Sequence, residues 1–317
     1  RHFTDKKIKT IINNNFAWAC RLRLFNIVCR PTINYRSFKM AVKIITLDLD
    51  GTLMSPDHLT VSQENKDALR AAHEKGVKIA VATGRTLAIM GDVCTQVPQV
   101  DYIIHSNGAG VVDRKTGERL YSNLMSWDFS EKIIDFLNTK PCFYELYVDG
   151  KSYVQEDRAP YFITDVLPKE FIDALMDRME VCTDAKAAIF GKDVEKITVY
   201  SNDSAAAKEL RAYFESLTDK ICFDSSLPGD GNMEMTKIGV DKGTALKGMC
   251  DVLGIDTSEA MALGDAGNDV SMLKVAGYSV AMGNGTDEVK AAAKYITLTN
   301  AESGVAAAVK KFVLGQD

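Results

Sequence analysis

The chain has 317 residues, 46% of them hydrophobic, and a formal net charge of −5 at pH 7. This length predicts two domains, and no apolar run is long enough to span a bilayer, so we expect a soluble, cytoplasmic enzyme. Residues 1–39 hold nine Lys or Arg and one acid, which leaves the remainder near −13. Such acidity argues against broad nucleic-acid binding, because phosphate contacts need a basic surface.

The first 39 residues differ in composition from the rest of the chain. They are Arg-rich and acid-poor, begin without a methionine, and precede Met40, which reads as a natural start leading directly into the first strand. We expect this segment to be translated upstream or expression sequence outside the fold; an Arg-rich targeting peptide and a membrane-surface helix are the alternatives. The seven cysteines are odd in number, widely spread and free of C-x-x-C pairs, which favours reduced thiols.

The first predicted strand, residues 44–47, is apolar and runs into the sequence DLDGT at residues 48–52. Open α/β sheets bind their ligands beyond the carboxyl ends of the strands, and Asp48 and Asp50 stand at such an end. Residues i and i+2 of a strand share a side, so these carboxylates would approach one another unless Gly51 bends the chain. A divalent cation relieves their repulsion, and a carboxylate freed from it can attack a phosphoryl group.

A second polar cluster follows the next predicted strand. A helical stretch over residues 62–75 leads to an apolar strand over residues 77–82. This strand ends in Thr83, Gly84 and Arg85, which supply a hydroxyl, a close-approach glycine and a fixed cation. Each of the three can hold a phosphate oxygen, so the second strand end also predicts phosphate chemistry.

The chain continues with a helical stretch over residues 86–97 and a strand over residues 102–106 that runs into a hairpin. This alternation of strands and helices is typical of a doubly wound parallel sheet in the α/β class. Between residues 124 and 226 the periodicity changes, and that block contains none of the polar clusters. Its expected helices are 129–137, 169–179 and 205–217, and its expected strands are 142–148, 151–155, 196–200 and 221–224.

The last third of the chain supplies the remaining polar residues. Lys242 stands at a predicted helix start, and a third apolar run, residues 261–263, leads to Asp265, Asn268 and Asp269. Each cluster alone is as typical of an ordinary turn or helix start as of a site. Three polar strand ends in this order predict one site at one edge of the sheet.

With these motifs the chain resembles the haloacid dehalogenase superfamily of phosphohydrolases, in particular its Cof-type branch, from about Met40 to the C-terminus. The four matching motifs lie at residues 48–52, at Thr83, at Lys242 and at residues 264–269. The ordered quartet is specific, whereas no single member is.

The resemblance implies a domain organisation as well as a fold. A Rossmann-like catalytic core is expected from residues 40–123 and 229–317. An inserted α/β cap domain, residues 124–228, is expected to close over the core and select the substrate. Residues 1–39 are expected to lie outside both domains.

The resemblance also implies a role for each motif residue. Asp48 is the expected nucleophile and a Mg²⁺ ligand, and Asp50 is the expected general acid and base, whose backbone carbonyl also reaches the metal. Asp265 completes the expected metal site. Asp269 and Arg85 are expected to hold these residues in place without contacting the metal themselves. The expected phosphate contacts are Leu49 through its backbone, Thr83, Gly84, Lys242 and Asn268.

The implied activity is a Mg²⁺-dependent phosphatase of small phosphomonoesters, sugar phosphates foremost, acting through an aspartyl-phosphate. Mg²⁺ prefers oxygen ligands, and the four histidines show no ligand spacing, so zinc is disfavoured. The expected partner is a small phosphorylated metabolite, with no nucleic acid and no membrane. A phosphomutase of the same superfamily and a phospho-aspartate signalling receiver are the alternatives; a receiver lacks the second carboxylate and needs no large insertion.

Overall fold

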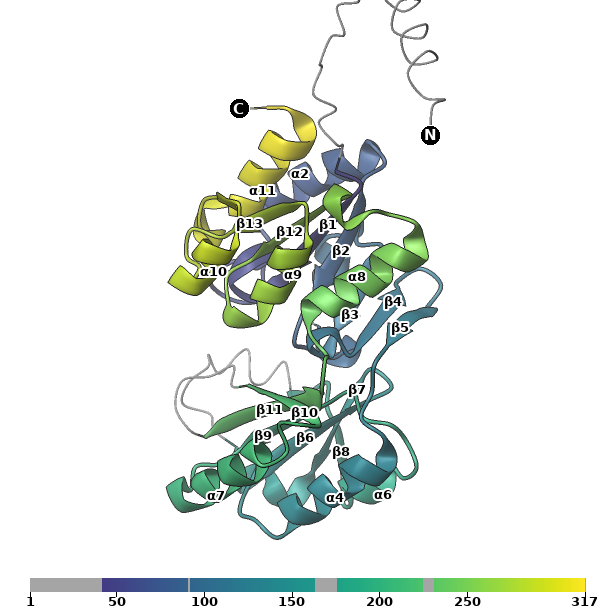
Figure 1. Cartoon of the computed structure of the whole chain (residues 1–317), viewed down its shortest axis with the longest axis vertical. Helices are drawn as coiled ribbons and strands as arrows, with labels where there is room; N and C mark the ends of the chain where they lie inside the picture. The colour runs from purple at the N-terminus through teal and green to yellow at the C-terminus, as the bar shows by residue number, and fades with distance from the viewer. Residues whose placement is uncertain (1–41, 91, 163–175, 225–230, 317) are drawn as a thin grey trace, which may run out of the picture. The chain divides into compact units, whose positions relative to one another are not determined.

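The computed structural model describes residues 42–90, 92–162, 176–224 and 231–316 (Figure 1). These residues fall within one compact unit, Met40–Asp317. The expectations for residues 1–39, and most of the helix expected over residues 169–179, lie outside the described residues. No helix in the described part of the chain combines the length and the apolar character that a membrane crossing needs.

The larger of the two sheets in the described residues has the strand order β14-β13-β12-β1-β2-β3-β4-β5. Neighbouring strands from β14 to β3 are parallel, and β4 and β5 continue the sheet in antiparallel fashion. The strands are β1 (Ile44–Asp48), β2 (Lys78–Ala82), β3 (Tyr102–His105), β4 (Gly110–Asp113), β5 (Arg119–Ser122), β12 (Ala260–Gly264), β13 (Tyr278–Ala281) and β14 (Tyr295–Ile296). The predicted α/β class with a parallel core sheet is confirmed.

Helices cover both faces of this sheet (Figure 1). In β1, Ile45 and Leu47 pack in one apolar cluster with α2 and α11, whereas Ile44 packs in a second cluster with α8 and α9. Successive strand residues point to opposite faces, so a strand covered on both faces is apolar throughout. The helices are α2 (Gln63–Glu74), α3 (Val93–Gln96), α4 (Trp127–Asn138), α6 (Ala185–Ala188), α7 (Ser204–Glu215), α8 (Lys242–Leu253), α9 (Val270–Val275), α10 (Asp287–Ala292) and α11 (Gly304–Val309).

The second sheet has the strand order β10-β11-β9-β6-β7-β8 and is antiparallel except for the β7–β8 pair. Its apolar face packs against α4 and α7 around Leu146, Ile197 and Phe214. The strands are β6 (Phe143–Val148), β7 (Lys151–Gln155), β8 (Glu180–Cys182), β9 (Lys196–Tyr200), β10 (Ile221–Asp224) and β11 (Asn232–Lys237). Four of them begin or end within one residue of the sequence expectation.

The expected boundary of the insertion at residues 228/229 is wrong. Strand β11, Asn232–Lys237, pairs with β9 and with β10 and therefore belongs to the second sheet. The chain returns to the first sheet's helices only at α8, which begins at Lys242. A short strand of mixed polar and apolar residues carries no signal of which sheet it joins, because pairing partners are set by tertiary structure. The role of the insertion stays a prediction.

The helix expected over residues 86–97 is replaced by two short pieces. A 3₁₀ turn spans Leu87–Ile89, and α3 spans Val93–Gln96. The backbone N–H of Ala88 donates to the carbonyl of Gly150 at 2.8 Å, in the turn between β6 and β7. This contact takes a donor that a regular helix would use within itself, and it joins the two sheets next to residues 83–85.

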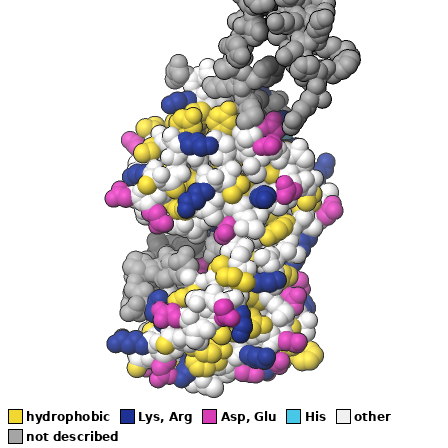
Figure 2. Space-filling model, in the orientation of Figure 1, with side chains coloured by type: hydrophobic (Ala, Val, Ile, Leu, Met, Phe, Trp, Pro, Cys, Tyr) yellow, Lys and Arg dark blue, Asp and Glu magenta, His cyan; other side chains and the backbone are white. Residues whose placement is uncertain are grey.

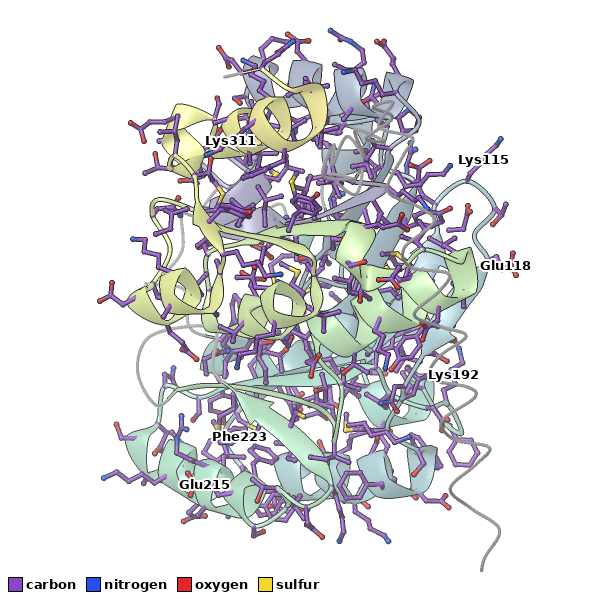
Figure 3. The ribbon with its side chains drawn as sticks, turned by 45° about the horizontal axis from the view of Figure 1, so that its top comes forward. Lys115, Glu118, Lys192, Glu215, Phe223 and Lys311 are labelled. Carbon is purple, nitrogen blue, oxygen red and sulfur yellow. The ribbon has the colours of Figure 1, made fainter. Side chains whose placement is uncertain are left out.

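Charged side chains of both signs are interspersed over the visible face of the described residues (Figure 2). Lys115 and Glu118, in the turn between β4 and β5, and Lys192 project outward from the ribbon (Figure 3). Lys192 pairs with Asp149 at 3.0 Å. Neither sign of charge dominates the part of the described surface seen in this view.

Candidate active site

Three parallel strands bring the expected site residues together. Strand β1 pairs with β2 on one side and with β12 on the other, so their carboxyl ends meet at one edge of the sheet. Asp48 is the last residue of β1, Thr83 follows β2, and Asp265 follows β12. Adjacent parallel strands that end level leave their following residues side by side, as the sequence predicted.

The turn after β1 separates the two aspartates of the first motif. Gly51 adopts a positive φ of 81°, and a Cβ at this position would clash with the Asp265 carboxylate. Thr52 Oγ1 donates to Asp265 Oδ1 at 2.8 Å, and Asn284 Nδ2 donates to the Gly51 carbonyl at 2.8 Å. The bend directs Asp48 and Asp50 to different partners, in the manner expected of Gly51.

Three carboxylates gather beyond the strand ends. Asp48, Asp265 and Asp269 each offer an oxygen within 4.8 Å of the others. Burial first, and then the neighbouring carboxylate of Asp269, raise the pKa of Asp48 well above its ordinary value. Burial likewise raises the pKa of Asp265 to about 6. Clustered carboxylates that resist ionisation are stabilised by a cation, and an all-oxygen donor set suits a hard ion such as Mg²⁺.

Lys242 lies within this cluster. Its Nζ donates to Asp48 Oδ1 and to Asp269 Oδ1, each at 2.6 Å, and its side chain is fully buried. Burial alone would lower the pKa of Lys242, but the charges of Asp269 and Asp48 outweigh it and raise the pKa. Lys242 therefore carries a permanent positive charge at the point where a phosphoryl group beside Asp48 would need one.

Asp269 holds the loop that follows β12. Its Oδ2 accepts hydrogen bonds from the backbone N–H groups of Asp265 at 2.9 Å and of Ala266 at 3.0 Å. Its other carboxylate oxygen accepts from Lys242. The sequence predicted that Asp269 orients the metal ligands without binding the metal. In the structure one Asp269 oxygen lies in the three-carboxylate cluster, and the other accepts hydrogen bonds from the loop that carries Asp265.

Asp50 stands apart from the three-carboxylate cluster. Arg85 donates to it twice, Nε to Oδ2 at 3.0 Å and Nη2 to Oδ1 at 2.5 Å, and His58 Nδ1 lies 3.0 Å from Oδ1. Burial opposes ionisation of Asp50, but the His58 hydrogen bond and the Arg85 charge together lower its pKa. The sequence analysis missed His58, which stands in the loop after the first motif with a φ of 58°.

The loop after β2 meets residues from two other loops. Thr83 is buried, and its carbonyl accepts from the N–H of Asn107 at 3.0 Å. Asn107 Oδ1 accepts from Asn268 Nδ2 at 3.3 Å and lies 2.9 Å from where a Cβ on Gly84 would stand. A side chain at position 84 would therefore have to displace the Asn107 amide, and the expected approach of Gly84 to a phosphate stays a prediction. Asn107 stands in none of the four motifs.

The Leu49 side chain is buried in the apolar cluster beneath α2, so only its backbone is available to this edge of the sheet. His105, at the end of β3, is fully buried, with Nδ1 3.3 Å from Glu195. Glu195 also accepts from Ser106 Oγ at 3.0 Å and from the N–H of Gly150 at 3.0 Å. These bonds join the two sheets and tie His105 to Ser106 and Glu195 in one buried network.

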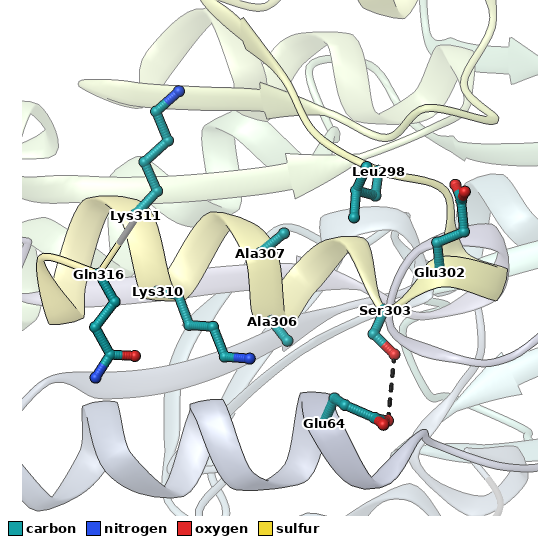
Figure 4. Close-up of a pocket in the computed structure, with 9 residues that line it drawn as sticks. All are labelled: Glu64, Leu298, Glu302, Ser303, Ala306, Ala307, Lys310, Lys311 and Gln316. Atoms are coloured by element: carbon teal, nitrogen blue, oxygen red, sulfur yellow. Dashed lines mark hydrogen bonds between the residues drawn. The ribbon is translucent and has the colours of Figure 1, made fainter.

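A pocket elsewhere in the described residues contains none of the expected site residues (Figure 4). It lies between α2 and α11, with apolar and charged side chains along its wall. In Figure 4 the Ser303 hydroxyl points toward Glu64, and the two are hydrogen-bonded at 3.5 Å. The candidate active site is therefore defined by the carboxylates, the lysine and the loops at the strand ends, and not by this pocket.

Comparisons with known proteins show which family the chain belongs to. The family model for haloacid dehalogenase-like hydrolases matches residues 45–309. A 5-amino-6-(5-phospho-D-ribitylamino)uracil phosphatase of Bacillus subtilis is 30% identical over 273 residues, which are 86% of this chain and 96% of the relative. A haloacid dehalogenase-like hydrolase from Bacteroides thetaiotaomicron has a similar structure, with a TM-score of 0.74 and 27% identity over 85% of this chain and 98% of that one. A sugar phosphatase of HAD subclass IIB also has a similar structure, with a TM-score of 0.68 and 26% identity over 85% of this chain and 98% of that one.

Proposed function

Because the chain belongs to the haloacid dehalogenase-like hydrolases and is a phosphoric monoester hydrolase, we propose that it is a Mg²⁺-dependent phosphatase of small phosphomonoesters, sugar phosphates foremost. Asp48 is the nucleophile in this proposal, and the intermediate is an aspartyl-phosphate. The single observation that carries it is the Asp48 carboxylate, which lies in a cluster with Asp265 and Asp269 and within 2.6 Å of the Lys242 ammonium.

The first half-reaction transfers the phosphoryl group to the enzyme. An Asp48 oxygen attacks phosphorus and the bond from phosphorus to the leaving oxygen breaks. Asp50 has to enter this half-reaction protonated, against the pull of Arg85 and His58 toward its ionised form, and it gives that proton to the leaving oxygen. Lys242, Thr83 and Asn268 hold the equatorial phosphoryl oxygens during transfer. Phosphoryl transfer needs positioning and charge neutralisation more than covalent chemistry, which suits this set of fixed donors.

The second half-reaction returns the enzyme to its starting state. Asp50 removes a proton from water, the water oxygen attacks phosphorus, and the bond to Asp48 breaks with release of phosphate. Arg85 and His58 stabilise the ionised Asp50, which is the form that accepts this proton. Asp48, Asp265 and Asp269 would hold Mg²⁺, which supplies neutralisation of the charge on the phosphoryl oxygens.

The signalling receiver is set aside, because the chain belongs to a hydrolase family and carries the second carboxylate that a receiver lacks. No observation favours a phosphomutase over a phosphatase. The test is a panel of phosphomonoesters with the purified protein and Mg²⁺. It includes sugar phosphates and 5-amino-6-(5-phospho-D-ribitylamino)uracil, the compound in the name of the Bacillus subtilis relative. Release of inorganic phosphate is the expected result, and its absence from every compound would overturn the proposal.

A further inference from the structure

The six-stranded sheet has one apolar face and one polar face. Leu146 and Ile197 on the apolar face pack against α4 and α7. These two helices lie on one side of the sheet (Figure 1). The alternate residues of the same strands point the other way, and the register places Glu145, Thr198 and Glu234 in one row across β6, β9 and β11. All three are buried. A buried polar row is unusual for a sheet face, since such faces are commonly either apolar or solvated.

A lysine–glutamate pair lies in this face. Lys196, opposite Tyr147 in the register, donates through Nζ to Glu234 Oε2 at 2.8 Å and lies 4.6 Å from the centre of the Tyr147 ring. Glu145 accepts from the Tyr147 hydroxyl at 3.2 Å and from Ser152 at 2.7 Å. A buried ion pair is weak evidence for stability, because desolvation offsets the attraction between the charges. The Lys196–Glu234 pair is therefore not explained by a gain in stability alone.

Hydrogen bonds connect this pair to the candidate active site. Glu234 Oε2 also accepts from Asn107 Nδ2 at 2.9 Å, and Asn107 in turn accepts from Asn268, one of the expected phosphate contacts. Glu234 and Lys196 are therefore separated from the phosphate-binding loops by the single side chain of Asn107. A group attached to a phosphate held by Asn268 would extend toward them.

The chemistry of the pair suits hydroxyl groups. A carboxylate accepts hydrogen bonds from neighbouring hydroxyls, an ammonium donates to a hydroxyl oxygen, and an aromatic ring beside them offers a flat apolar surface. Lys196 is already paired with Glu234, as Arg85 is with Asp50 and Lys242 with Asp48. A second anionic group on the leaving alcohol would therefore lie beside the Glu234 carboxylate, while the charge of Lys196 is already balanced by Glu234.

We propose that Lys196 and Glu234 bind the hydroxyl groups of the leaving alcohol, and that this pair selects neutral polyol phosphates over phosphates that carry a second anionic group. This inference rests on the proposed function and adds the class of leaving group to it. Both side chains are specificity-determining residues, and neither takes part in bond making or breaking.

The test compares two substrates of the same chain length with the full chain and Mg²⁺. Glucitol 6-phosphate and 6-phosphogluconate differ at C1, where one has a neutral CH₂OH and the other a carboxylate. We expect kcat/KM to favour glucitol 6-phosphate by about tenfold or more, since the site is built to pair hydroxyls. The ratio of the two values within one variant cancels any difference in the amount of folded enzyme.

Two variants should move this ratio in opposite directions. Glu234→Gln keeps the shape but frees the charge of Lys196 to pair with a carboxylate, so the preference for glucitol 6-phosphate should shrink about fivefold or more. Lys196→Gln removes the cation and should keep or increase the preference while lowering kcat/KM for glucitol 6-phosphate. The matched control is Glu180→Gln, which neutralises the half-exposed partner of Lys151 on the same sheet and should leave the ratio unchanged.

The outcomes separate this inference from the proposed function. If phosphomonoesters are hydrolysed but the wild-type ratio is near one, if neither polyol compound is turned over, or if both variants shift the ratio the same way, the inference is overturned and the phosphatase stands. If no phosphomonoester is hydrolysed at all, the proposed function falls and this inference falls with it.

Discussion

The two sheets of this protein both carry buried charged side chains, but they place them differently. In the eight-stranded sheet the charges stand where strands end, as Asp48 does at the end of β1. In the six-stranded sheet they stand within strands, as Glu145 and Glu234 do in β6 and β11. Strand ends bring loops together and suit chemistry, whereas a strand interior offers a fixed flat surface and suits recognition. We expect substitutions in the two regions to differ accordingly.

The largest effect is expected at Asp48. Asp48→Asn removes the attacking carboxylate and should lower kcat by about 10⁴-fold or more, together with loss of the acid-trapped phosphoenzyme. Asp50→Asn should slow both half-reactions by about 10²–10⁴-fold and still allow Mg²⁺ to bind, since its expected metal contact is a backbone carbonyl. Rapid acid quench with labelled substrate measures the amount of phosphoenzyme and the rate of each half-reaction in the two variants.

Isotope labelling supplies the control for this assignment. Turnover in ¹⁸O-water should place the label in the released phosphate, because water attacks phosphorus. Label in the Asp48 carboxylate, or an acid-stable adduct that survives in Asp48→Asn, would contradict the role of Asp48.

Metal removal is the next largest effect. EDTA should abolish turnover and Mg²⁺ restore it, because three clustered carboxylates lose the cation that neutralises them. Asp265→Asn should raise the Mg²⁺ concentration needed for half-maximal rate about tenfold or more. Asp287→Asn, at an exposed position in the first turn of α10, is the matched control and should leave that concentration unchanged. Full turnover after thorough chelation would exclude a metal at this site.

The raised pKa values predict how metal binding depends on pH. Asp265 has its pKa raised to about 6, and the pKa of Asp48 is raised as well, so both bind protons more readily than ordinary aspartates. Protons compete with the metal, so protonation of Asp265 should lower Mg²⁺ affinity as pH falls through about 6, roughly tenfold per unit once that carboxylate is protonated, and the raised pKa of Asp48 acts in the same direction. Calorimetric titration from pH 5 to 8 measures this. An affinity that stays constant down to pH 5 would contradict it.

The smallest effects are expected at two helix caps, one in each region. Asp241 accepts from the N–H of Thr244 at 2.7 Å at the start of α8, and Asp203 accepts from Ala205 and Ala206 at the start of α7. Changing either to Ala should cost about 1 kcal/mol of unfolding free energy, measured by urea denaturation.

Only one of these two caps adjoins the site. Asp241→Ala should also lower kcat severalfold, because α8 begins with Lys242, whereas Asp203→Ala should leave kcat unchanged. Equal losses of activity in the two variants would show that the caps act only through stability. Asn at either position keeps the cap and should restore stability.

Much of the fold and the site could be predicted from the sequence, because the relevant signals are local. The apolar run at residues 44–47 followed by DLDGT predicts both a buried parallel strand and the position of its carboxyl end from fewer than ten neighbouring residues. Gly51 predicts the bend that follows. The resemblance to the haloacid dehalogenase superfamily is confirmed by the family match over residues 45–309. The roles of individual residues, the Mg²⁺ requirement and the substrate class stay predictions for the experiments above.

Other features depended on the tertiary structure. Strand β11 pairs with the second sheet, which its own residues do not predict. The helix expected over residues 86–97 is interrupted, and the Ala88 N–H there donates to the Gly150 carbonyl, a residue far away in the sequence. His58, Asn107 and Glu234 stand in no motif, and only the fold brings them within hydrogen-bond distance of Asp50, Asn268 and Lys196. The sequence by itself determined which chemistry stands at the strand ends, because backbone geometry and side-chain type act locally. Only the tertiary structure decided which distant polar groups complete that site, because their pairing depends on contacts between residues far apart in the chain.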